Sequence, residues 1–123
     1  MRTRLIACAL LCVAAADANA LAPLDCSKGF DALYREAAAR RSAKSYEASP
    51  WRIVENAAEK AVYSFTASGH YAHPSVVRRQ VVQRGDGVSI NRSACSYADK
   101  AQSDRLMAEF DAMDAQLRAK AGR

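Results

Sequence analysis

Two β-rich runs separated by a glycine-flanked turn constrain the fold more than any other part of this chain. The runs "SVVRRQVVQR" (75–84) and "VSINRSAC" (88–95) enclose the tight sequence "GDG" (85–87). Valine and isoleucine favour strands, and an Asp-Gly turn between two such runs is a strong signal for a hairpin. The sequence therefore predicts an antiparallel sheet built around this hairpin.

A second pair of short strands is expected upstream. The segments "WRIVE" (51–55) and "KAVYSFT" (60–66) carry β-branched and aromatic residues, and "NAAE" between them can turn a hairpin. The alanines leave an alternative open, in which "IVENAAEKAVY" continues as a helix. The sheet is therefore expected to have three or four strands, and residues 51–60 decide the number.

The segment before these strands has the pattern of an amphipathic helix. Apolar residues recur at helical spacing in its first half: Phe30, Leu33, Tyr34, Ala37 and Ala38. The pattern runs from Phe30 to Tyr46 and predicts a helix that begins slightly earlier, near Ser27. Pro50 ends it, because the residue before a proline is pushed toward extended geometry.

The C-terminal part of the chain also has a helical pattern. Its apolar residues follow at steps of four, three and four: Leu106, Phe110, Met113 and Leu117. Ser96 followed by Asp99 matches a capping box at the start of this helix. The acidic residues Asp111 and Asp114 lie off the apolar stripe and are expected on the helix surface.

These elements predict an α+β fold in a small single domain. An N-terminal helix, an antiparallel sheet of three or four strands and a C-terminal helix follow one another along residues 21–123. A sheet of this size needs one face covered, and two amphipathic helices supply that cover. The other face of the sheet is then expected to meet solvent.

The first twenty residues have the layout of a secretory signal peptide. Arg2 and Arg4 precede an apolar run from Leu5 to Ala16, and Ala18-Asn19-Ala20 matches a cleavage site. The apolar run is shorter than the roughly twenty residues that cross a bilayer, so no transmembrane segment is expected. The sequence thus predicts an exported bacterial protein, periplasmic or secreted, that begins at Leu21 after processing.

Removal of this leader leaves two cysteines, Cys26 and Cys95. An even pair in an oxidising compartment is typical of a disulfide, and the spacing is not the C-x-x-C of a redox pair. The bridge would attach the first helix to the edge of the sheet. Free thiols or metal ligation are the alternatives.

His70 and His73 are the chain's two histidines and form an H-x-x-H motif beside Gly69 and Pro74. The glycine and the proline indicate a loop, so regular structure does not set the geometry of the two imidazoles. The pair is a candidate metal site that would need further ligands. The alternatives are a structured turn and a partner-binding loop, and no cofactor is expected otherwise.

Arginines gather on the predicted hairpin at Arg78, Arg79, Arg84 and Arg92. Neighbouring strand residues point to opposite sides, so one of Arg78 and Arg79 is expected to face the helices and pair with a helix carboxylate. Alternation then places Arg78, Gln80 and Arg84 on the solvent face. That face is interpreted as a docking surface or as a solvated face that discourages strand aggregation.

These observations favour a binding function. The formal net charge of +5 is mild for a nucleic-acid-binding protein, and export makes nucleic acid an unexpected partner. The hypothesis is a small accessory protein that engages another protein or an anionic surface through its sheet face and the loop at residues 68–79, with His70, His73, Arg78, Arg79 and Arg84 as the binding residues. The alternatives are a metal-binding protein using His70 and His73, and a small hydrolase with one histidine as general base.

Overall fold

The computed structural model describes residues 19–121, so the predicted signal peptide lies almost entirely outside the described residues. In chain order the elements are η3 (Cys26–Lys28), α2 (Phe30–Ala39), β1 (Ala43–Ala48), β2 (Trp51–Asn56), β3 (Ala61–Thr66), β4 (Ser75–Arg84), β5 (Gly87–Ser96) and α3 (Lys100–Ala121). This order confirms the predicted α+β fold of a helix, a sheet and a second helix.

The strands form one antiparallel sheet in the order β1-β2-β3-β4-β5. Each strand pairs with its neighbour in the chain, and the register places Trp51 opposite Thr66 and Arg79 opposite Arg92. The sheet has five strands instead of the predicted three or four. The helical alternative for residues 53–63 is wrong, since that segment forms the β2–β3 hairpin.

The additional strand is β1, which the sequence pattern assigned to the first helix. That helix ends at Ala39, and Ser42 has a positive φ of 72° in the turn that follows. The segment "AKSYEA" then pairs along its whole length with β2. Pairing with a neighbouring strand outweighs the weak helical preference of these residues, and Pro50 lies in the β1–β2 turn after a cis peptide bond.

The β4–β5 hairpin has the predicted boundaries within one residue. Arg84 pairs with Gly87 across a two-residue turn, and Gly85 has a φ of 56°. A positive φ at the first central residue but not at the second, Asp86, is the conformation of a type II′ turn, which glycine adopts without strain. Both strands are ten residues long, so this hairpin is the longest part of the sheet.

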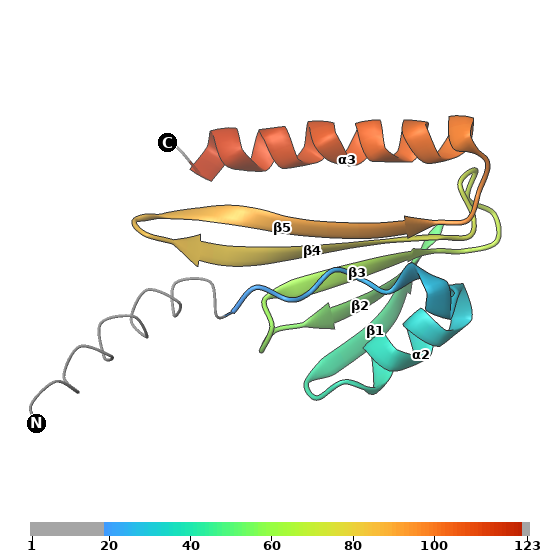
Figure 1. Cartoon of the computed structure of the whole chain (residues 1–123), viewed down its shortest axis with the longest axis horizontal. Helices are drawn as coiled ribbons and strands as arrows, with labels where there is room; N and C mark the ends of the chain where they lie inside the picture. Colours follow the sequence, from blue (N-terminus) through green and yellow to red (C-terminus); the bar gives the residue numbers. More distant parts are fainter. Residues whose placement is uncertain (1–18, 122–123) are drawn as a thin grey trace, which may run out of the picture.

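The two helices cover opposite faces of the sheet, which corrects the expectation that they share one face (Figure 1). Val76 packs in the cluster on the α2 side, and its neighbour Val77 packs in the cluster on the α3 side. Successive residues of a strand point to opposite faces, so β4 is buried on both. The first part of β4, residues 75–80, therefore has no side that meets solvent.

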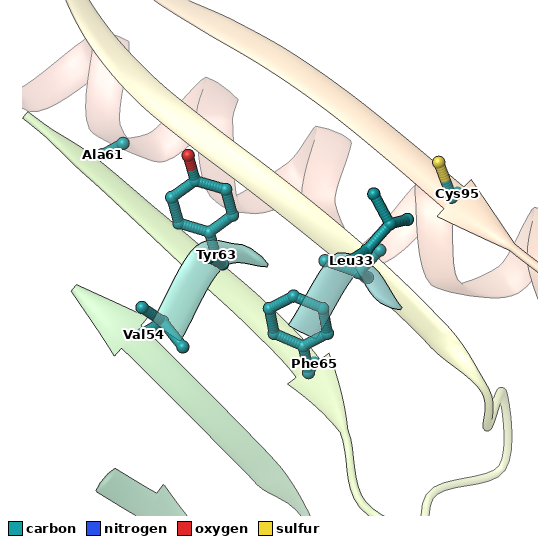
Figure 2. Packing of buried hydrophobic residues seen from close by; sticks show 8 residues of the cluster. Leu33, Val54, Ala61, Tyr63, Phe65 and Cys95 are labelled. Atoms are coloured by element: carbon teal, nitrogen blue, oxygen red, sulfur yellow. The ribbon is translucent and has the colours of Figure 1, made fainter. Parts of the chain in front are cut away.

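The core on the α2 side is centred on β3. Phe65 is fully buried and makes edge-to-face contacts with Phe30 and Tyr34, at centroid distances of 5.6 and 5.1 Å. Figure 2 shows Tyr63 and Phe65 on this strand together with Leu33 of α2. These contacts fix α2 against the lower-numbered strands.

The core on the α3 side uses only the first half of that helix. Leu106 and Phe110 are buried against Val77 and Ala72, whereas Met113 and Leu117 are 39 and 45% exposed. The helix starts after Asp99, whose Oδ1 accepts a hydrogen bond from the Gln102 amide at 2.9 Å. Asp99 is thus the cap, and Ser96 is the last residue of β5.

A disulfide and an extended segment hold the N-terminal region to the sheet. Cys26 is bonded to Cys95 on β5, which confirms the predicted bridge. Residues 21–25, here called the strap, cross the α2 face: the Leu21 amide donates to Gln80 Oε1 and the Leu24 amide donates to Ser93 Oγ, both at 2.9 Å. Within residues 19–121, none of the helices has the length and apolarity to cross a membrane.

Candidate functional site

An ion cluster joins α3 to the middle of the β4–β5 hairpin. Arg79 Nη1 donates to Asp114 Oδ1 at 2.9 Å, and Arg92 Nη1 donates to Asp114 Oδ2 at 3.2 Å. Arg92 Nη2 also donates to Asp111 at 2.6 Å. The prediction that one of the paired arginines meets a helix carboxylate is confirmed, but Asp114 is buried and not on the surface.

An apolar groove lies between α3 and the hairpin, on the turn side of this ion cluster. The hairpin groove, as we call it, has a volume of about 670 Å³ and is lined by Val81, Asp86, Gly87, Val88, Ile90, Leu117 and Arg118. Val81 and Val88 are 43 and 49% exposed, and Leu117 approaches the same groove from the helix. Apolar side chains from β4, β5 and α3 thus face one open space.

Two cations lie on the helix side of the hairpin groove, Arg118 in its lining and Lys120 beyond it. Arg118 and Lys120 are in the last turn of α3, where they also complement the negative end of the helix dipole. Lys120 shares a smaller neighbouring cleft with Met113 and Leu117. Among the residues that line the groove itself, Asp86 is the one carboxylate. An apolar ligand with negative charge at its edge therefore matches this surface best.

Arg78 is buried on the opposite, α2 face, so the prediction that it meets solvent is wrong. Its side chain is 4% exposed and lines a cleft of about 280 Å³ between the strap and α2. Within residues 19–121, its Nε and Nη2 atoms have no hydrogen-bond partner. Gln80, also predicted on a solvent face, is 2% exposed beneath the strap.

The groups around Arg78 leave its charge without a direct carboxylate partner. Tyr63 lies opposite Arg78 in the register, and the Tyr63 hydroxyl donates to Glu59. The Glu59 carboxylate in turn accepts from Arg40 Nε at 2.6 Å. Burial is the main cause that lowers the pKa of Arg78, and nearby Tyr63 and Glu59 oppose it only in part.

Arg84 lies at the end of β4, next to the hairpin turn. Its side chain is exposed, and Nε donates to Ser89 Oγ at 2.9 Å. The three predicted binding arginines therefore do not form one surface: Arg78 faces α2, Arg79 faces α3 and Arg84 lies at the tip of the hairpin.

His70 packs into the α3 side of the molecule. Its ring lies 4.5 Å from the Trp51 ring and 4.5 Å from the Tyr71 ring, measured between centroids. The Ala72 amide donates to His70 Nδ1 at 2.9 Å, so this nitrogen carries no proton. Burial lowers the pKa of His70, whereas burial and a hydrogen bond to Glu109 raise the pKa of Tyr71 to about 12.

His73 packs toward the other helix. Its ring is edge-on to Phe30 with centroids 5.2 Å apart, and Nδ1 lies 2.8 Å from Thr66 Oγ1. The same Thr66 hydroxyl oxygen accepts from the Ser75 amide and is fully buried. These bonds close the loop that joins β3 to β4.

The structure does not bring the two histidines into a common ligand set. Their ring neighbours belong to opposite faces of the sheet, and residues 19–121 contain no group of three histidine, cysteine or acidic side chains placed to hold a metal ion. A cleft of about 570 Å³ includes His73, Asp31 and Ser68. Within the described part of the chain, no hydrogen bond joins Ser68 to either imidazole.

Sequence reasoning missed the residues that make the hairpin groove and the Arg78 cleft. One signal was present: the doublets Val76-Val77 and Val81-Val82 place apolar side chains on both faces of β4, a pattern typical of strands covered on both sides. No local pattern identifies Tyr63 or the strap as neighbours of Arg78, because these contacts arise only when the sheet is assembled.

Comparisons of this chain with protein families, with curated proteins and with solved structures gave no match.

Proposed function

We propose that this protein is a small exported accessory protein that binds a partner protein in the hairpin groove. The observation that carries the proposal is the pair of half-exposed apolar walls, with Leu117 on α3 and Val81 and Val88 on the hairpin. Exposed apolar surface that is contiguous and rimmed by polar groups is typical of protein–protein contact sites.

The partner segment is expected to be apolar with carboxylates at its edge. Arg118 lines the groove and Lys120 lines the neighbouring cleft, and the chain as a whole carries a formal net charge of +5. Complementary charge speeds association and selects orientation, while apolar burial supplies most of the affinity. This proposal keeps the expected protein partner and moves the docking surface from the centre of the sheet to the hairpin end.

Site-specific photo-crosslinking in the producing cell tests this placement. A photoreactive amino acid at Val88 should yield an adduct with a different protein, and the same amino acid at exposed Lys44 on β1 serves as the matched control. A Leu117→Asp substitution should remove the Val88 adduct, because a carboxylate would enter the apolar wall. The adduct should also weaken with added salt and with Arg118→Glu.

Three results would contradict the proposal. Equal adducts from positions 88 and 44 would show non-specific contact. An adduct of the chain with itself would make the groove a self-association surface. Binding to vesicles of anionic phospholipid that Leu117→Asp abolishes, without a protein adduct, would identify a membrane surface as the ligand.

A further inference from the structure

Arg78 presents an unusual combination of burial and unsatisfied donors. The side chain is 4% exposed, yet its Nε and Nη2 atoms have no partner among residues 19–121. Leaving buried donors unpaired is costly, and the cost is larger when the group is charged. Such a group calls for a physical explanation, and a bound anion is one.

The two unpaired nitrogens define the shape of the missing partner. In a guanidinium group, Nε–H and one N–H of Nη2 point in the same direction and form a planar fork. This fork matches the two oxygens of a carboxylate in a bidentate arrangement. Tyr63 lies beside Arg78, opposite it in the register of β3 and β4.

The acidic side chains beside the cleft are already engaged. Asp25 accepts from Ser27, and Glu36 accepts from Lys28 Nζ at 2.9 Å. Glu59 is bound by Arg40 and Tyr63. Within the described residues, therefore, no carboxylate of the chain itself is placed to complete the Arg78 fork.

The rest of the cleft is about equally apolar and polar, with Asp25, Lys28, Glu36, Arg40 and Tyr63 among its lining residues. Its apolar lining comes from the strap and from α2: Leu21, Ala22, Pro23, Leu24, Leu33 and Ala37. A ligand that fills the cleft would place a small aliphatic body against these residues and its charged end at Arg78. The volume of about 280 Å³ has room for roughly ten non-hydrogen atoms, so a small branched acid fits with space left over.

We propose that the cleft between the strap and α2 binds a compact aliphatic carboxylate, held bidentately by Nε and Nη2 of Arg78. The group is a free monocarboxylic acid or the terminal carboxylate of a peptide, and the chemistry of recognition is the same. Both nitrogens are shielded, so the ligand enters when the strap lifts from Gln80 and Ser93. This site is separate from the hairpin groove and does not depend on it.

Arginine side-chain nuclear magnetic resonance tests the proposal on the unmodified oxidised protein. Isobutyrate should produce a saturable shift of one Nε–H signal, and isobutyramide, which has the same shape without the charge, should not. Arg78→Lys assigns the signal, because the signal disappears from its spectrum. The comparison of acid and amide needs no variant and stands even if Arg78→Lys does not fold.

Calorimetry gives the affinities that identify the recognising group. Arg78→Lys keeps the charge but loses the fork, so isobutyrate should bind at least about tenfold more weakly. Arg35→Lys, on the exposed face of α2, should leave the affinity unchanged. An Arg78→Lys protein that folds and binds isobutyrate as tightly as the original would overturn the proposal, as would the absence of saturable binding to the original chain.

Two further probes separate the sources of the carboxylate. A tripeptide ending in valine, compared with its C-terminal amide, should bind more tightly than isobutyrate if the natural ligand is a chain terminus, and more weakly if it is a free acid. Inorganic phosphate is the third probe. Saturable binding of phosphate alone, without binding of either carboxylate, would show a site for tetrahedral anions and contradict the assignment.

Discussion

Arg79 on β4 donates to Asp114 on α3 at 2.9 Å, and this bond marks the boundary between the packed and the open halves of the helix. On one side of it Leu106 and Phe110 are buried, and on the other Leu117 is exposed. The sheet and α3 are thus joined by apolar packing at one end and by charge in the middle. The end near the hairpin turn is left open.

Asp114→Ala should lower the free energy of unfolding by about 2–4 kcal/mol. The substitution leaves Arg79 and Arg92 partly buried without their shared carboxylate, and breaking a buried pair in this way is strongly destabilising. Asp111→Ala is the control, because Asp111 is 67% exposed and should change stability by less than about 1 kcal/mol. Urea denaturation measures the free energy of unfolding of both variants. Equal losses in Asp114→Ala and Asp111→Ala would contradict the prediction.

Leu106→Ala and Leu117→Ala should lower the stability by different amounts, because Leu106 lies in the buried half of α3 and Leu117 in the exposed half. Leu106 is fully buried, so its truncation should cost about 3 kcal/mol. Leu117 is half exposed, and its truncation should change the stability by less than about 1 kcal/mol while weakening partner binding. Thermal melts and the crosslinking assay together test this, and a large loss of stability in Leu117→Ala would make the groove part of the core.

Stability should fall as the pH drops below about 6.5. Burial lowers the pKa of His70 in the folded state, so the unfolded chain binds the proton more readily. The contribution of neutral His70 is complete above the pKa of the unfolded state and is lost as the pH falls toward the lower folded value. Protonation of Nδ1 would also break its bond from the Ala72 amide.

His70→Asn tests the source of this pH dependence. Asparagine can accept from the Ala72 amide through Oδ1 but does not titrate, so unfolding between pH 7 and 5 should be less pH-dependent than in the original chain. An unchanged dependence in His70→Asn would assign the effect to other groups.

Removal of the disulfide should destabilise the protein by up to about 4 kcal/mol. Cys26 and Cys95 are 69 residues apart, and the chain-entropy model gives this figure for a loop of that length. The double variant Cys26→Ser/Cys95→Ser should therefore unfold at lower urea concentration. An unchanged midpoint would mean that the strap and α2 hold this region without the bridge.

Zinc should not raise the melting temperature through the histidines. A metal that binds only the folded state stabilises it by mass action, but His70 and His73 pack against opposite faces. Melts with Zn²⁺ and with a chelator are expected to coincide. A rise that His70→Ala and His73→Ala each abolish would contradict this and restore the metal-binding hypothesis.

The hairpins and the disulfide were predictable because their signals are local or covalent. The turn at Gly85 and the β-branched runs around it specify β4 and β5, and an even pair of cysteines specifies the bridge. β1 was not predictable in the same way: "AKSYEA" has no strong preference, and its pairing with β2 decides its conformation. A local sequence pattern does not show which other segment of the chain will pair with it.

The burial of the functional residues could not be predicted from local patterns either. Alternation correctly separated Arg78 from Arg79, but it could not say that both faces of β4 are covered. The burial of Arg78 depends on the strap, about 55 residues earlier in the chain, and the burial of Asp114 depends on two arginines from the hairpin. Each candidate site therefore forms only when distant segments of the chain pack together, and local sequence patterns do not identify such contacts.

The strand order also bears on how the chain reaches this structure. Every strand pairs with its neighbour along the chain, so the sheet can grow hairpin by hairpin while closing only short loops. Sheets with such local pairing are expected to fold faster than those that join distant segments. The strap and the Cys26–Cys95 bridge make the distant connections, so we expect them to form last, on a sheet that is already in place.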